Sequence, residues 1–254
     1  GGHAGAQLRL AEAYEYGHFD LAIDLKEART WYQTAAKGGN GFAQWRLGKA
    51  YEKGNFGLVT DEEEALKWYK MAAEVGNGYA QWRLGDAYEF GDKLTLPIDL
   101  EEAFKWYRMA ADSDHAGAQG RLGEAYEDGD LGRAIDLQVA LMWFQKAAGS
   151  GDCYAQCRLA EAYEDGDLGR ATDLQVAVMW FKEAAKGGNI TSQWRLGNAY
   201  EKGELGLETD EEEALKWYNM AADDGISFSC AQLRLAQAYE KGELGLVTDE
   251  EEAL

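Results

Sequence analysis

Two kinds of charged residue recur at fixed spacing along this chain, and they are its most regular candidates for chemistry. An arginine precedes a Leu-Gly or Leu-Ala pair, and a glutamate follows that arginine by six residues, as in Arg46 and Glu52. On a helix these two side chains lie on opposite flanks, so stacked helices would bring arginines of one copy toward acids of the next. We predict a ladder of ion pairs between copies that sets the twist of the stack. Its arginines are Arg46, Arg83, Arg121, Arg158 and Arg195, with Arg9 and Arg234 at equivalent positions.

A stripe of aromatic and acidic residues runs along the same helices, away from the expected core. Trp45, Lys49 and Glu52 fall at i, i+4 and i+7 and therefore share one helix face. If this face lines a groove, the groove is acidic with a few aromatic anchors and suits a basic or extended peptide. The alternative is that the tryptophans only wedge neighbouring helices together. The candidate groove residues are Trp45, Trp82, Trp194, Glu52, Glu89, Glu127, Glu164 and Glu201.

The other reactive side chains form no catalytic constellation. His3, His18 and His115 are scattered and lack a paired nucleophile, so we expect no enzyme activity and no cofactor. The Asp-Gly-Asp sequences of two loops lack the alternating acids and closing glutamate of an EF-hand, which favours a turn over a metal site. Asn189-Ile-Thr191 is an N-glycosylation motif and a weak sign of secretion.

These residues recur because the chain is a tandem repeat. A segment of 37 to 39 residues opens with Ala-Gln, or once with Ser-Gln, and occurs seven times, the last copy being truncated. A fixed period of this length indicates a solenoid, in which each repeat packs on its neighbours. We expect a single solenoid over residues 1–254, with repeats at 6–42, 43–79, 80–117, 118–154, 155–191, 192–230 and 231–254.

Each repeat predicts two helices, here called helix A and helix B. In the second repeat Ala43, Leu47 and Ala50 recur on one face of helix A, and Gly54 ends that helix. An aspartate then opens helix B, and in five repeats a glutamate three residues later predicts a capping box. The expected N-cap residues are Asp24, Asp61, Asp99, Asp136, Asp173, Asp210 and Asp249.

Helix B carries a tryptophan followed by a tyrosine or phenylalanine. In the second repeat Ala65, Trp68 and Ala72 form a stripe, and we interpret these tryptophans as core residues and not as a cofactor box. Two antiparallel helices per repeat, stacked with a small rotation, predict an all-α superhelix with a concave side.

The repeat pattern A-x-aromatic-x-L-G-x-x-Y-x-x-G, then D-x-x-x-A, then W-Y/F-x-x-A-A-x-x-G resembles the Sel-one-like repeat (SLR) family, relatives of the tetratricopeptide repeats. The resemblance covers all seven repeats and is most complete in the second. It implies a right-handed α/α superhelix that serves as a protein-interaction scaffold, with helix A lining the concave groove. The family is more varied at the arginine position, so its pattern says nothing about the arginine ladder.

Composition narrows the range of partners. With 46 acidic and 25 basic residues the net charge is -21, so a nucleic acid or a phosphate-rich membrane surface would be repelled. No run approaches the ~18 apolar residues of a membrane span. The three cysteines are too few and too irregular for a disulfide framework. We expect a soluble protein, and a cytoplasmic and an extracellular location both stay open.

Two functions fit this pattern. The first is a non-enzymatic scaffold whose concave, acidic, helix A-lined face binds a protein or peptide. The second is a structural rod or filament in which copies stack end to end. Both ends of the sequence fall inside a repeat, without a polar capping repeat, so we expect a fragment of a longer array.

Overall fold

A computed structural model describes residues 3–91, 94–223 and 229–246, which form thirteen α-helices and no strand. The chain divides into two compact parts, Gly1–Ile135 and Asp136–Leu254, and each is described by itself. The first part contains α1 (Ala4–Tyr16), α2 (Leu25–Lys37), α3 (Gly41–Lys53), α4 (Glu62–Glu74), α5 (Gly78–Phe90), α6 (Leu100–Asp112) and α7 (Ala116–Asp128). The second contains α8 (Leu137–Gly149), α9 (Cys153–Asp165), α10 (Leu174–Lys186), α11 (Ile190–Lys202), α12 (Glu211–Asp223) and α13 (Ser229–Lys241).

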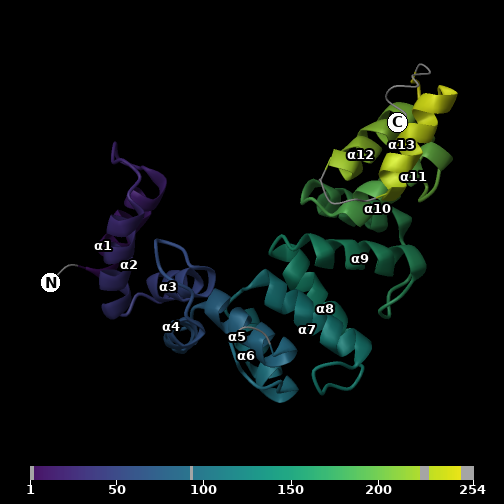
Figure 1. Ribbon diagram of the computed structural model, residues 1–254. Coiled ribbons are helices and arrows are strands. Elements are labelled where there is room, and N and C mark those ends of the chain that lie inside the picture. The colour runs from purple at the N-terminus through teal and green to yellow at the C-terminus, as the bar shows by residue number, and fades with distance from the viewer. Residues whose placement is uncertain (1–2, 92–93, 224–228, 247–254) are drawn as a thin grey trace. The chain divides into compact units, whose positions relative to one another are not determined.

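Odd-numbered helices are the predicted A helices and even-numbered helices the predicted B helices. Within one repeat the two helices pack side by side, as α5 and α6 do in Figure 1. Helix B then packs on helix A of the following repeat, as α4 does on α5 and α10 on α11. The most extensive contacts are therefore between helices that follow one another in the chain, which is the packing of a solenoid.

Two predicted helix ends are confirmed, namely the glycine that ends helix A and the aspartate that begins helix B. Gly54 ends α3 in the left-handed conformation, with φ at 71°. Asp61 caps α4, because its carboxylate accepts the backbone N–H of Glu64 at 3.0 Å. The aspartate at the equivalent position of the other repeats caps α2, α6, α8, α10 and α12. Asp249 lies outside the described residues.

The second half of the predicted capping box is wrong. The backbone N–H of Asp61 donates to the carbonyl oxygen of Tyr51 on α3 at 3.0 Å, and not to Glu64. Glu64 instead accepts a hydrogen bond from Lys67 at 2.7 Å. The antiparallel turn brings the end of helix A beside the start of helix B, so a backbone carbonyl satisfies the cap N–H first. The same bond joins Asp24 to Tyr14, Asp99 to Tyr88, Asp173 to Tyr163 and Asp210 to Tyr200.

Helix A also has an N-cap, which was not predicted from the sequence. Asn40 precedes α3, and its side-chain oxygen accepts the N–H of Ala43 at 2.9 Å. Asparagine, aspartate or histidine fills this position three residues before the Ala-Gln or Ser-Gln pair. The caps are His3, Asn40, Asn77, His115, Asp152 and Asn189.

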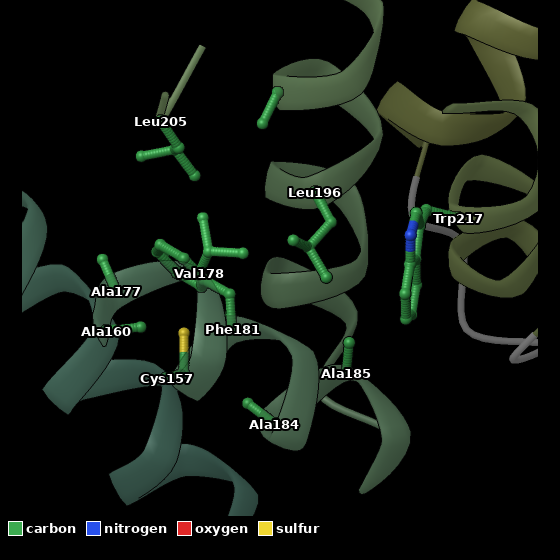
Figure 2. Packing of buried hydrophobic residues seen from close by; sticks show 11 residues of the cluster. Cys157, Ala160, Ala177, Val178, Phe181, Ala184, Ala185, Leu196, Leu205 and Trp217 are labelled. Carbon is green, nitrogen blue, oxygen red and sulfur yellow. The ribbon is translucent and has the colours of Figure 1, made fainter. Parts of the chain in front are cut away.

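The core buries the aromatic residue after the tryptophan more completely than the tryptophan itself. Tyr69 is 1% exposed, whereas Trp68 is half-buried and packs against the cluster formed by the first repeat and the first half of the second. Among the described B helices the tryptophan is buried only as Trp143 and Trp217. The predicted tryptophan core is thus corrected to a core centred on tyrosine or phenylalanine. Figure 2 shows one such cluster, with Phe181 of α10 facing α11.

Small residues on helix A let the two helices of a hairpin approach closely. A Cβ atom at Gly85 would lie 2.7 Å from the ring of Tyr107, and one at Gly48 would lie 2.7 Å from the ring of Tyr69. The Leu-Gly pair of the repeat therefore supplies one buried leucine and one contact without a side chain. In the first repeat Ala11 takes the glycine position and shares a buried cluster with Tyr32.

Candidate functional site

One glutamate of helix A joins three helices at the boundary between repeats. The carboxylate of Glu52 on α3 accepts hydrogen bonds from Arg83 on α5, at 2.5 Å from Nη2 and 3.1 Å from Nε. It also accepts the hydroxyl of Tyr69 on α4 at 2.6 Å. The Glu52 and Arg83 side chains are only 15% and 13% exposed. This arginine–glutamate–tyrosine group therefore lies mostly inside the joint and is screened from solvent.

The same group recurs at other joints. The structure brings Arg46 to Glu15, Arg121 to Glu89, Arg195 to Glu164 and Arg234 to Glu201. Tyrosine hydroxyls complete three of these groups, from Tyr32 to Glu15 at 2.6 Å, Tyr107 to Glu89 at 2.7 Å and Tyr218 to Glu201 at 2.6 Å. Glu164 has no such donor on α10, because Phe181 stands in the tyrosine position.

In the last four repeats, the arginine also pairs with a second acid, which belongs to the same repeat as the arginine. Arg158 pairs with Asp167 at 2.6 Å and Arg234 with Glu243 at 3.0 Å, and Arg121 and Arg195 bind Asp130 and Glu204. These acids were not predicted from the sequence. Their signal is an Asp or Glu nine residues after the arginine, in the loop before helix B.

Burial and hydrogen-bond donors together determine the pKa values within the arginine–glutamate–tyrosine group. Burial by itself would raise the pKa of Glu52, but the hydrogen bonds from Arg83 and Tyr69 outweigh it and hold that pKa below its ordinary value. At Glu201 the bond from Arg234 is the largest influence, and the pKa is again lowered. Burial raises the pKa of Tyr218, so its hydroxyl stays a hydrogen-bond donor over the whole physiological range. The carboxylates of Glu52 and Glu201 are therefore charged and the Tyr218 hydroxyl is neutral near pH 7.

The glutamine that opens each repeat is a further link that sequence reasoning missed. Gln81 is 2% exposed, and its Nε2 donates at 3.0 Å to the carbonyl of Ala73 on the preceding helix B. The bond recurs from Gln44 to Ala36, Gln119 to Ala111, Gln156 to Ala148 and Gln193 to Ala185. Each of these glutamines fixes one repeat on the last turn of the helix before it.

The predicted aromatic stripe lines a pocket on α3 and α5. The cavity has a volume of about 430 Å³, and its walls include Trp45, Trp82 and the exposed rings of Tyr79 and Phe90. Trp45 and Tyr79 lie 5.1 Å apart, and Trp82 stacks on His115 at 5.4 Å. The tryptophans thus contact neighbouring A helices and face the pocket at once. Trp194, in the second part of the chain, packs on Tyr218 at 5.1 Å.

The charges at this pocket differ from a simple acidic groove. Glu52 belongs to the arginine–glutamate–tyrosine group, and Asp86 accepts the Tyr107 hydroxyl at 2.7 Å. Lys49 lies 5.3 Å from the Trp45 ring, and Lys53 also lines the cavity. Of the other candidate acids, Glu89, Glu164 and Glu201 belong to ladder pairs, and Glu127 is half-buried on α7.

Asn189 is the N-cap of α11 and is 5% exposed. Its side-chain oxygen accepts the N–H of Ser192 at 2.8 Å. A glycan on Asn189 would require this cap and its burial to be given up.

No group of three or more His, Cys, Asp or Glu residues in the described ranges could hold a metal ion. Burial raises the pKa of the Cys157 thiol to about 12, which keeps it protonated and unreactive. None of the described helices has the length and apolar character needed to cross a bilayer.

The geometry defines an all-α repeat scaffold, with neighbouring repeats joined by buried polar links and an aromatic pocket on two A helices. The Sel1 repeat model matches residues 4–40, 41–77, 78–115, 116–152, 153–189, 190–226 and 231–254, and the chain belongs to this family. The first six matches begin at the first residue of an A helix, two residues before the boundary that the Ala-Gln or Ser-Gln pair predicts. The predicted all-α repeat fold and its family are thereby confirmed, and proteins of this family generally bind other proteins.

Two solved structures are similar over nearly the whole chain. A Sel1 repeat protein from Oxalobacter formigenes is 32% identical with a TM-score of 0.82, and the match covers 99% of this chain and 96% of that one. The Escherichia coli protein c5321, a protective antigen of uropathogenic strains with an SLR fold, is 34% identical with a TM-score of 0.73. That match covers 98% of this chain and 52% of c5321, so the chain spans about half the length of that relative.

A more distant structure shares the fold alone. The immunity protein PA5088 from Pseudomonas aeruginosa is 20% identical with a TM-score of 0.56, over 87% of this chain and 82% of that one. A comparison with curated proteins found no match.

Proposed function

We propose that the chain is a binding scaffold that holds a peptide segment of a partner protein on its A helices, with the pocket of α3 and α5 as the anchor. The observation that carries the proposal is the pocket between Trp45 and Trp82, whose rings are half-buried and border a cavity of about 430 Å³. Tryptophans in partly desolvated pockets dominate the free energy of many protein interfaces. Each ring is supported by an aromatic neighbour, which keeps the pocket formed before binding.

The net charge of the chain and the charges at the pocket together indicate the chemistry of the partner. At long range the net charge of -21 attracts a basic segment and speeds its approach. At the pocket itself, Lys49 and Lys53 disfavour a cationic side chain. The proposed segment therefore contains an apolar or aromatic residue that enters the pocket. Lysines or arginines flank this residue and face the acidic surface outside the pocket.

Fluorescence anisotropy with three labelled peptides tests this function. The peptides are a leucine flanked by lysines, the same sequence with alanine for leucine, and the same sequence with glutamates for lysines. We expect the first to bind most tightly, with affinity falling as salt is added. Trp82→Leu should weaken it by about tenfold or more. Leucine occupies the equivalent position in the first repeat as Leu8, so the fold should accept this change.

Trp194→Leu is the matched control, because it alters the same repeat position in the other part of the chain. It should leave binding unchanged. Equal affinity of Trp82→Leu and the unaltered protein would reject the α3 and α5 pocket as the anchor. Equal affinity for the lysine and glutamate peptides would reject the basic partner.

A further inference from the structure

The outer surface of helix B is usually covered by charge at its first turn. In α4, Glu64 accepts a hydrogen bond from Lys67 at 2.7 Å, and in α12 Glu213 accepts one from Lys216 at 2.8 Å. Lys105 and Glu102 form the same pair in α6. Two or three acidic residues occupy the first turn of each of these helices.

Two consecutive B helices of the second part, α8 and α10, replace this charge with apolar residues. Val139 and Met142 stand where α4 has its Glu–Lys pair, and Val176 and Met179 stand there in α10. Met142 and Met179 are 42% and 49% exposed, and the leucines that open both helices are also exposed. We call this surface the Leu-Val-Met face, made of Leu137, Val139, Met142, Leu174, Val176 and Met179.

The Leu-Val-Met face is poorer in acidic charge than the equivalent surface of α4, α6 and α12, although Asp136 and Asp173 cap its two helices. Neither α8 nor α10 has an acidic residue in its first turn, and over their full lengths Glu183 is the sole acid beside Lys146, Lys182 and Lys186. Two copies of a chain with net charge -21 repel each other over most of their surface. Around the Leu-Val-Met face the three acids Asp136, Asp173 and Glu183 are matched in number by the three lysines, so that repulsion is weaker there and apolar area is offered instead.

The sequence of the face is repeated, which suits a two-fold contact. Both helices begin Leu-Gln-Val-Ala and continue with Met-Trp-Phe after one further residue. In an isologous interface residue i contacts residue j and j contacts i. Two equivalent stripes on consecutive repeats provide this, because α8 of one copy can lie on α10 of the other while the reciprocal pair forms at the same time. Methionine side chains adapt their shape to such a contact.

We propose that the Leu-Val-Met face is an interaction surface for a second copy of this chain, and that two copies pack through α8 and α10 as a closed dimer. The proposal is independent of peptide binding on the A helices, because it concerns B helices of the other part of the chain.

Sedimentation equilibrium of the full chain over a range of concentrations tests the proposal. The variant is Val139→Glu with Met142→Lys and Val176→Glu with Met179→Lys, which copies the Glu–Lys pair of α4 into both helices. Because α4, α6 and α12 fold with this pair, the variant should keep the helical circular dichroism spectrum and melting behaviour of the unaltered protein. We expect the unaltered protein to reach twice the mass of the monomer and the variant to remain monomeric. Added salt should strengthen the dimer, because it screens the remaining repulsion.

The control is Glu64→Ala with Lys67→Ala on α4, which should leave the dimer intact. Three results would overturn the proposal. One is a monomer at every concentration of the unaltered protein. The second is a dimer that the α8 and α10 variant retains. The third is an open series of larger assemblies, which a closed two-fold contact does not form.

Discussion

At the residue scale, a single carboxylate organises five of the joints between repeats. Glu52 lies on one A helix and binds a guanidinium of the next A helix and a hydroxyl of the helix B between them. An exposed ion pair contributes about 0–1 kcal/mol, but this one is mostly buried and charge-assisted, so its loss leaves two donors unsatisfied. From its geometry and burial we expect the group to help set how consecutive repeats are oriented.

Glu52→Gln should lower the free energy of unfolding at pH 7 by about 2–3 kcal/mol, because Arg83 loses its charged acceptor. The Glu52 pKa is lower in the folded chain than its unfolded value of about 4.3, so the charged carboxylate stabilises the fold above that pH. This stabilisation is lost as the pH falls through the folded pKa. Urea unfolding at several pH values should show the difference between the two proteins shrinking below about pH 4. A difference that is constant from pH 7 to pH 3 would contradict the assignment.

The arginine and its glutamate could be predicted at this scale because both are charged and strictly periodic. The tyrosine hydroxyl could not, because its contact depends on how helix B is rotated toward helix A, and Phe144 and Phe181 fill the same sequence position. The glutamine bond was also missed. Gln81 binds a backbone carbonyl, and because every residue has one, the sequence does not show which carbonyl accepts the bond.

At the scale of the element, the hairpin depends on one close approach between its two helices. Gly85 faces the ring of Tyr107, and no side chain fits between them without a shift. Element type and order followed from periodicity, glycine stops and aspartate caps. Helix starts were less predictable, because Asn40 and its equivalents cap α3 and the other A helices from beyond the expected repeat boundary.

Gly85→Val should destabilise the chain by about 1–3 kcal/mol through overpacking against Tyr107. Gly85→Ala is the matched control and should be close to neutral, because the gain in helix propensity of about 1 kcal/mol offsets a small shift of the ring. The first repeat already combines Ala11 with Tyr32 in one cluster. The midpoint of urea unfolding measures both variants. Equal midpoints for the two would mean that the contact is looser than described.

At the scale of the whole molecule, the excess of acid opposes folding and self-association alike. The net charge of -21 produces repulsion that salt screens, whereas the ladder pairs are half-buried or more and are screened less. Net charge was readable from composition. The sequence did not show which acids pair with a basic side chain, because that pairing depends on how the repeats stack.

Adding sodium chloride up to physiological ionic strength should therefore raise the thermal midpoint, by about 2–4 °C for each kcal/mol of relieved repulsion. Circular dichroism at increasing salt measures the effect, and potassium chloride should act equally if screening is the cause. A midpoint that falls with salt would mean that surface ion pairs contribute more than the net charge opposes.

The glutamine link has a consequence for how such a chain can change in length. Each joint from Gln44 to Gln193 is made by the same side chain on the same carbonyl of the helix before it. A gene duplication or deletion of one whole copy would recreate an identical joint on both sides, so the new neighbours would already fit. A change by part of a copy would leave a glutamine without its carbonyl. Arrays of this kind should therefore lengthen or shorten in whole steps.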